Sequence, residues 1–565
     1  MLPISRRSFL ALTAVVIVTG CSSSGTTSGT SVADAPGDSP PDPAGATSST
    51  PATSSTPATT AATTTAAPPT TQAPGDPPTA EYEGTTDPFV LGVASGDPVA
   101  GSVVLWTRLV AGAGEALIGE RAVAVIWEAD DDPSDGGANW ITTDESSAHS
   151  VHALIEGLDA DRWYTYRFRS GGFTSAVGRT RTAPADDAAV EQFSVGSASC
   201  QNYENGFYAA HDDIAAAGLD LLVWLGDYIY EGGPGVLGVE GTVRLHDAPE
   251  PTTLDEYRAR YALYKQDPSL QAAHGACPWL VTWDDHEVEN NYAGTTAQDG
   301  VDLASRRAIA YRAWWEHTPT RLAPPASDPA DYTIYRSQRW GTLVDLSLLD
   351  TRQYRSDQAC NDITLSLDPA CPETYLPERT LLGEEQETWL FERVGRQGAT
   401  WNVLAQQVIM TDATLNGAVL NFDQWDGYPA DRDRVLQHVV DAGVDNFVVL
   451  TGDIHFAGIG NLLAPAVAGA PAETVRPTIG AEFVASSISS SGNVPEAAAP
   501  IVQSIPTIVD IELAHRGWVK HTVTPESWTA DYRIVEDSTN PASPSTTYRR
   551  FVVDAGQPGA RPLEP

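Results

Sequence analysis

Four clusters of acidic, histidine, tyrosine and cysteine side chains could carry chemistry together. They are Ser199-Cys200-Gln201-Asn202, Gly226-Asp227-Tyr228-Ile229-Tyr230, Asp284-Asp285-His286-Glu287 and Gly452-Asp453-Ile454-His455. Thiolate, imidazole and carboxylate are the groups that proteins offer to transition metals, and Ca²⁺ prefers carboxylate oxygen. The third cluster packs three acids around one histidine, and acids so close repel one another unless cations compensate them. The residue types therefore indicate a metal site.

Each cluster follows an apolar stretch that is typical of a β-strand. The predicted strands cover residues 193–197, 219–225, 279–283 and 447–451. In open α/β sheets, sites form beyond the carboxyl ends of the strands, which is where the four clusters lie. Taken singly, Asp227 could be a turn residue, the third cluster a solvated acidic turn, and Cys200 a buried core thiol.

Residues 186–565 have the alternating pattern of an α/β domain. We predict another strand at 401–408, and a hairpin whose strands, 332–336 and 342–349, flank Trp340 and Gly341. Helical periodicity covers 302–317, 383–396 and 430–443. The predicted fold is α/β with a partly mixed sheet.

Residues 87–185 read as an all-β domain. Short strands rich in β-branched and aromatic residues are expected at 102–107 and 122–127. A turn followed by an alternating strand at 157–168 resembles the tyrosine corner of fibronectin-type sandwiches. We therefore predict an N-terminal β-sandwich domain that ends in a linker near residue 185.

The N-terminus predicts export. Arg6 and Arg7 precede an apolar run that is too short to cross a bilayer, which is typical of a twin-arginine signal peptide over residues 1–20. Cys21 follows a small residue, as in a bacterial lipobox, and would carry a lipid anchor to the outer face of a membrane; the alternative is a simple cleavage site beside an incidental cysteine. Residues 21–86 are mostly Thr, Ala, Ser and Pro and predict a disordered stalk.

Charge and cysteine content narrow the function further. The net charge of −41 excludes nucleic-acid binding by a basic face and electrostatic attachment to anionic lipid. In an exported protein, Cys360 and Cys371 are expected to form a disulfide that closes a surface loop. We expect Cys277 to be a buried structural thiol.

The order of the four clusters resembles that of the calcineurin-like metallophosphoesterases, and specifically of the PhoD-type branch. In that branch a cysteine replaces the first ligand and tyrosines follow the second block. Longer strings extend the resemblance, namely Gly92–Pro98, Val104–Arg108, Leu349–Arg355, Ala405–Gln407 and Trp425–Pro429. The resemblance implies a layered α/β/β/α sandwich with an N-terminal fibronectin-like β-sandwich domain.

The resemblance also implies a role for each site residue. The ligands of a ferric ion, Fe³⁺, would be Cys200, Asp227, Tyr230 and His455. Asp227 would bridge to Ca²⁺, whose other ligands would be Asp285, Asn290 and Asp453, with Asn291 an equally available choice. His286 would be the general acid. Asp285 and Asp453 stand where the wider superfamily has neutral ligands, which favours Ca²⁺ over Zn²⁺.

The expected activity is that of an alkaline phosphatase and phosphodiesterase. Two metals would activate water and release phosphate from extracellular phosphomonoesters and phosphodiesters. One alternative is a phospholipase D-like phosphodiesterase that acts on lipid or cell-wall polymers. Another is a surface-binding lipoprotein with an inactive phosphoesterase fold, and the presence of ligands in all four clusters argues against it.

Overall fold

The computed structural model describes residues 75–236, 242–326, 332–360, 371–396, 398–467, 469 and 474–563. The predicted signal peptide and lipobox cysteine, together with the stalk up to residue 74, lie outside these residues. Within the described part of the chain, every helix is too short or too polar to cross a membrane.

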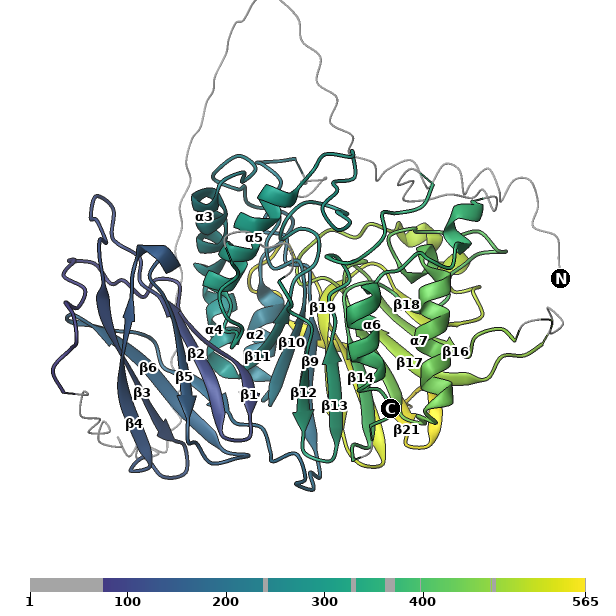
Figure 1. Ribbon diagram of the computed structural model, residues 1–565, viewed down its shortest axis with the longest axis horizontal. Helices are drawn as coiled ribbons and strands as arrows, with labels where there is room; N and C mark the ends of the chain where they lie inside the picture. The colour runs from purple at the N-terminus through teal and green to yellow at the C-terminus, as the bar shows by residue number, and fades with distance from the viewer. Residues whose placement is uncertain are drawn as a thin grey trace, which may run out of the picture.

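Three β-sheets build the molecule, and Figure 1 shows the sheet with β3, β4 and β6 at the left end. The ten-stranded sheet has the order β22 (Gln557–Pro562), β21 (Ser545–Asp554), β20 (Ser527–Val535), β19 (Arg516–Val523), β9 (Phe193–Ala198), β10 (Leu221–Leu225), β11 (Trp279–Thr282), β1 (Val93–Val99), β2 (Ser102–Arg108), β5 (Ser150–Glu156). The seven-stranded sheet has the order β12 (Arg336–Trp340), β13 (Val344–Leu348), β14 (Trp401–Ala405), β15 (Phe447–Thr451), β17 (Thr478–Val484), β16 (Ala457–Leu463), β18 (Ile508–Glu512). The third sheet contains β4 (Gly136–Thr143), β3 (Arg121–Ala129), β6 (Trp163–Ser170), β7 (Phe173–Thr174) and β8 (Gly178–Arg181), which pairs with β6.

The two larger sheets pack face to face. Along β10, Val223 lies in the core shared with Val403 and Val448 of the other sheet, whereas the next residue, Trp224, faces the helices. This alternation follows from the two-residue period of a strand, and a strand covered on both faces needs apolar residues at every position. The predicted apolar strands therefore belong to two stacked sheets.

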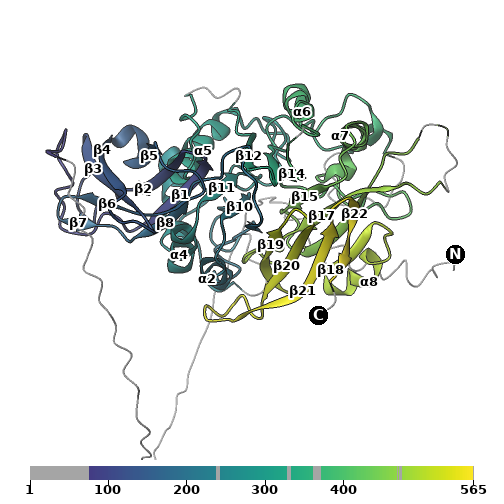
Figure 2. The ribbon, with the colours of Figure 1, turned by 90° about the horizontal axis from the view of Figure 1, so that it is seen from below.

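Helices cover the outer faces of both sheets. Those over the ten-stranded sheet are α2 (Ala209–Ala216), α3 (Leu254–Lys265), α4 (Pro268–Ala276) and α5 (Ala304–His317). Those over the seven-stranded sheet are α6 (Gly383–Phe391) and α7 (Pro429–Asp441), which Figure 2 shows on the side away from β20 and β21, and α8 (Ala499–Val502) is a short turn near β18. The layers thus confirm the α/β/β/α sandwich.

Local signals explain where the helices begin. Thr253 caps α3 in a reciprocal capping box with Glu256. Asp267 caps α4, and Pro268 follows it in the first turn. A backbone N–H there has no partner within the helix, so proline, which lacks this N–H, is tolerated. α6 ends at Phe391, five residues before the predicted end at 396.

The N-terminal strands form a β-sandwich whose core contains Val103, Val125 and Phe168. Its tyrosine corner is present, because the Asp159 N–H donates to Tyr164 Oη at 2.9 Å. Half of this sandwich belongs to the ten-stranded sheet, since β1 pairs in parallel with β11 at Gly96 and Trp279. The sequence did not indicate this continuity.

Two boundaries differ from the prediction. The hairpin pairs 336–340, rather than 332–336, with β13, because the chain reverses at Gly341, where φ is +54°. Residues 75–86, predicted as the end of the stalk, contact the five-stranded sheet: Tyr82 is 4% exposed, and its N–H donates to Ser170 Oγ at 2.9 Å. The side chain of Tyr82 provides the apolar surface that the rest of the stalk lacks.

Candidate active site

The loops that carry the predicted ligands leave their strands in a strained backbone conformation. Cys200, Asp227, Asp453 and His455 have φ values of 61°, 56°, 62° and 59°. Non-glycine residues rarely adopt this left-handed region, and such strain, about 1–3 kcal/mol per residue, concentrates at functional sites. Gly226 is required before Asp227, because a Cβ there would lie 2.4 Å from Asp284 Cβ.

The four residues expected to bind iron come together. Ligand atoms of Cys200, Asp227 and His455 lie within 4.8 Å of one another. The Tyr230 hydroxyl joins them, because it is 2.8 Å from Asp227 Oδ2 and 3.0 Å from His455 Nε2. The structure thus assembles these groups from the ends of β9, β10 and β15, the last of which is more than 200 residues from the other two in sequence.

Two further groups of ligand atoms extend the site. Asp227 belongs to a second group with Asp285 and His286, and Asp285 belongs to a third group with Asp284 and Asp453. The shared residues make the three groups contiguous. This arrangement suits more than one cation, with Asp227 in a bridging position.

Several carboxylate oxygens of this site accept no hydrogen bond from the residues that the structure describes. Asp227 Oδ1, Asp284 Oδ2 and Asp285 Oδ1 are buried and accept no hydrogen bond from a described residue. Burial, followed by repulsion from Asp423, raises the pKa of Asp453 to about 7, although Arg352 opposes the shift. Buried acidic oxygens that accept no hydrogen bond are costly, so the donor set fits bound cations.

The Cys200 thiol and the Tyr230 phenol also indicate a bound cation. Burial, and then the charge of Asp227, raise the pKa of Cys200 and of Tyr230 well above their usual values. Neither group would ionise here without a cation beside it, and a coordinating metal supplies that charge.

His286 is held by an acid that the sequence analysis did not identify. Glu231 Oε2 lies 2.7 Å from His286 Nδ1, and Glu231 Oε1 accepts the Asn290 N–H at 2.9 Å. The rings of His286 and Tyr230 have centroids 4.1 Å apart. Burial disfavours the imidazolium, but the carboxylates of Glu231 and Asp285 outweigh it and hold the pKa of His286 well above its usual value. Nε2 is left as the ring nitrogen for proton transfer.

Arg352 is the second residue whose role the sequence did not reveal. Its side chain is fully buried, Nη1 lies 2.8 Å from Asp423 Oδ1, and Nη2 lies 3.1 Å from Asp453 Oδ1. It also pairs with Asp284 and, at 3.4 Å, with Asp285. The string Leu349–Arg355 was noted only as part of a family pattern. Arg355 also pairs with Asp423, at 2.5 Å, so two guanidinium groups face four carboxylates and a negative excess remains, which further favours cations.

Two of the predicted calcium ligands lie together, and the third, Asn290, makes a different side-chain contact. Asp285 and Asp453 share a ligand group, whereas the Asn290 side chain contacts Gln298 Oε1 at 3.4 Å on the exposed side. The Asn291 N–H donates to Asp285 Oδ2 at 2.6 Å, so this residue supports the site through its backbone.

The other cysteines that the structure describes, Cys277, Cys360 and Cys371, behave as expected. Cys277 is 1% exposed and lies in the apolar core beneath α3 and α4. Cys360 and Cys371 form a disulfide with Cα atoms 6.2 Å apart. The structure thereby confirms the predicted bridge.

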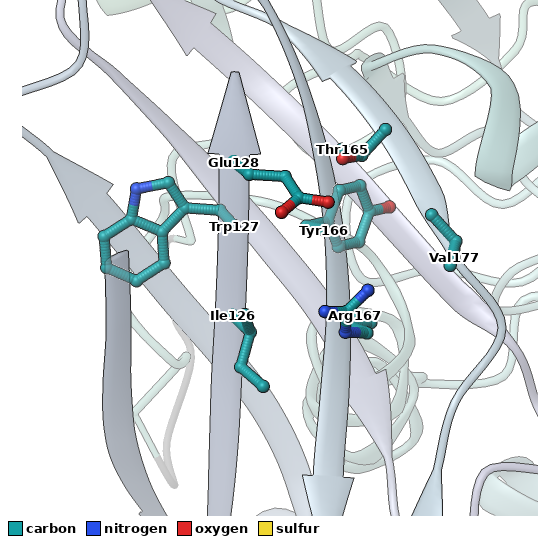
Figure 3. Close-up of a pocket in the computed structure, with 7 residues that line it drawn as sticks. All are labelled: Ile126, Trp127, Glu128, Thr165, Tyr166, Arg167 and Val177. Carbon is teal, nitrogen blue, oxygen red and sulfur yellow. The ribbon is translucent and has the colours of Figure 1, made fainter. Parts of the chain in front are cut away.

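A separate shallow depression lies between β3 and β6 of the N-terminal domain (Figure 3). Glu128, Thr165, Tyr166 and Arg167 line it together with apolar residues. None of the predicted ligands or acids borders it, so it is no part of the candidate site.

The fold and the site define a phosphoric ester hydrolase of layered α/β/β/α architecture. Residues 193–532 match the PhoD-like phosphatase family, and residues 75–184 match the N-terminal domain of PhoD-like phosphatases. Alkaline phosphatase D of Bacillus subtilis (strain 168) is 44% identical over 490 residues, which cover 84% of this chain and 82% of that protein. A solved structure of PhoD is 41% identical and superposes with a TM-score of 0.80, covering 86% of this chain and 94% of that one. The chain belongs to the PhoD-like phosphatase family.

Proposed function

We propose that the chain is an exported, metal-dependent alkaline phosphatase that hydrolyses extracellular phosphomonoesters and phosphodiesters. The observation that carries this proposal is the set of three contiguous ligand groups that share Asp227 and Asp285. Several of their buried carboxylate oxygens accept no hydrogen bond from the described residues, so bound cations would stabilise them.

Fe³⁺ and Ca²⁺ are the metals we propose. Cys200, Asp227, Tyr230 and His455 would hold the iron, because thiolate and phenolate are strong donors to an oxidised ion. The all-oxygen set of Asp285 and Asp453, with Asn290 as a predicted third ligand, suits Ca²⁺. When bound, such metals neutralise phosphate oxygens and make water a better nucleophile.

His286 is proposed to protonate the leaving oxygen. Its Nδ1 is engaged by Glu231 at 2.7 Å, which orients the ring and supports the imidazolium. Contact with the tilted ring of Tyr230, whose centroid lies 4.1 Å away, restricts the ring further. Positioned general acids of this kind contribute about 10²–10⁴-fold in rate.

Export and anchoring belong to the same proposal. Arg6 and Arg7 would direct the chain through the twin-arginine route, and lipid on Cys21 would hold the mature protein at the outer face of the membrane. Replacing both arginines by lysine is expected to keep the protein inside the cell. Normal export of that double variant, seen by cell fractionation, would remove the basis for this route.

The function is tested by comparing two buried cysteines. We expect Cys200→Ser to lose most hydrolysis of p-nitrophenyl phosphate and bis-p-nitrophenyl phosphate, with loss of bound iron measured by elemental analysis. Cys277→Ser is the matched control, because this thiol is equally buried but lies in the apolar core. Equal activity and metal content in both variants would contradict the ligand role of Cys200, and inactive wild-type protein would contradict the function itself.

A further inference from the structure

A serine-rich segment, residues 486–491, lies against the loop that carries Cys200. Ser199 and Ser487 form a parallel bridge, and the Ile488 N–H donates to Ser199 O at 3.0 Å. The Ser490 N–H donates to Cys200 O at 3.3 Å. The segment therefore joins the end of β17 to the cysteine ligand.

The same segment contacts the other candidate iron ligands. Ser491 O lies 2.8 Å from His455 Nδ1, which directs Nε2 of that ring toward the Asp227 side of the site. Ser490 Oγ donates to Tyr230 Oη at 2.7 Å. This short segment therefore contacts three predicted iron ligands, namely Cys200 through its backbone, and His455 and Tyr230 through their side chains.

The Ser490 hydroxyl has one proton and two acceptors for it. Ser490 is 1% exposed, and its Oγ accepts the Asn202 N–H at 3.0 Å. Its proton can go to Cys200 O at 2.8 Å or to Tyr230 Oη at 2.7 Å. A hydroxyl offers a single donor, so the choice depends on what the two acceptors need.

A metal bound to Tyr230 would favour the phenolic oxygen as the acceptor, because Ser490 Oγ already lies 2.7 Å from it. As a phenol, Tyr230 has its own proton to give to Asp227 Oδ2, 2.8 Å away. As a phenolate ligand it can only accept, and a charged acceptor draws a stronger hydrogen bond than a neutral carbonyl. Ser490 is the hydroxyl donor placed to supply that bond.

We propose that Ser490 is a positioning residue that donates a hydrogen bond to the Tyr230 phenolate, fixing its direction and stabilising its charged, metal-binding form. This inference rests on the proposed function, in which Tyr230 is an iron ligand. Outer partners of metal ligands orient them and tune the metal, and their loss commonly lowers metal affinity about 10–100-fold.

The test compares Ser490→Ala with Ser489→Ala in the full-length protein. Ser489 is also 1% exposed, but its hydroxyl donates to Asn202 O at 2.8 Å and touches no candidate ligand side chain. Iron affinity would be measured by competition with a chelator, and the phenolate-to-iron absorption band by spectroscopy. Ser490→Thr, which keeps the hydroxyl, is a second comparison.

We expect Ser490→Ala to move the band to longer wavelength and to weaken iron binding about 10–100-fold. Ser489→Ala and Ser490→Thr should keep the wild-type band. An unchanged band and affinity in Ser490→Ala, or equal changes in Ser489→Ala, would overturn the inference. Wild-type protein that binds no iron would instead overturn the metal assignment on which the inference rests.

Discussion

Glu231→Gln is the change that most sharply separates proton donation from metal binding. The variant keeps the shape of the side chain but removes the charge that faces His286 across 2.7 Å. Two charges about 4 Å apart interact by about 4 kcal/mol at an effective dielectric of about 20. Part of this support is retained, because glutamine still accepts a hydrogen bond from Nδ1.

The expected loss follows from that partial support. We expect kcat to fall about 10–100-fold, which corresponds to about 1.4–2.7 kcal/mol of transition-state stabilisation. The loss should depend on the leaving group: an alkyl phosphate needs a proton on its departing oxygen, whereas p-nitrophenolate leaves readily without one. Steady-state assays on an alkyl, a phenyl and a p-nitrophenyl phosphate provide this comparison.

Glu289→Gln serves as the control for this prediction. Glu289 is a nearby acid that pairs with Arg306 at 2.5 Å rather than with His286. We expect it to keep wild-type rates on all three substrates. The reasoning is refuted if Glu231→Gln lowers turnover of every substrate equally, because a uniform loss would indicate damage to the metal site rather than to proton transfer.

Three other predictions concern stability and anchoring. Burial lowers the pKa of His521 from 6.5 to about 3, and its Nδ1 accepts the Trp528 Nε1–H. The stability that neutral His521 contributes is therefore present above pH 6.5 and falls by about 1.4 kcal/mol per pH unit below it. His521→Gln should remove this contribution to the slope in urea unfolding between pH 6 and 4, and an unchanged slope would show that the reasoning is wrong. Asp97→Asn weakens the pair with Arg336 at 2.8 Å that joins the N-terminal sandwich to β12, so it should lower the free energy of unfolding by about 3–5 kcal/mol, and a loss below 1 kcal/mol would exclude this role. Cys21→Ser should release mature protein from the membrane fraction, and retention there would indicate another anchor.

Much of the site could be predicted because its residues follow apolar strands. The strands ending near Cys200 and Asp227 were visible from their continuous apolar residues, and parallel strands bring their carboxyl ends to the same edge. The apolar pattern shows where a strand ends, and it therefore also shows which residues lie at the carboxyl end of that strand.

Other residues of the site left no local signal. Arg352 reaches Asp284 across 68 residues, and nothing in the spacing of either shows that contact. Glu231 follows Tyr230 directly, and its partnership with His286 depends on how two loops fold toward each other. The junction of β1 with β11 rests on a single register pair, which creates no pattern in sequence.

The central claim is that Cys200 and Tyr230 hold iron in a two-metal phosphoesterase site. X-ray diffraction from crystals of the purified protein, collected on either side of the iron absorption edge, tests it most directly. We predict an iron signal in contact with Cys200 Sγ, Tyr230 Oη, Asp227 and His455, and a second ion without iron signal beside Asp285 and Asp453. A zinc signal at both positions in fully active enzyme, with Cys200 and Tyr230 unbound, would contradict the account.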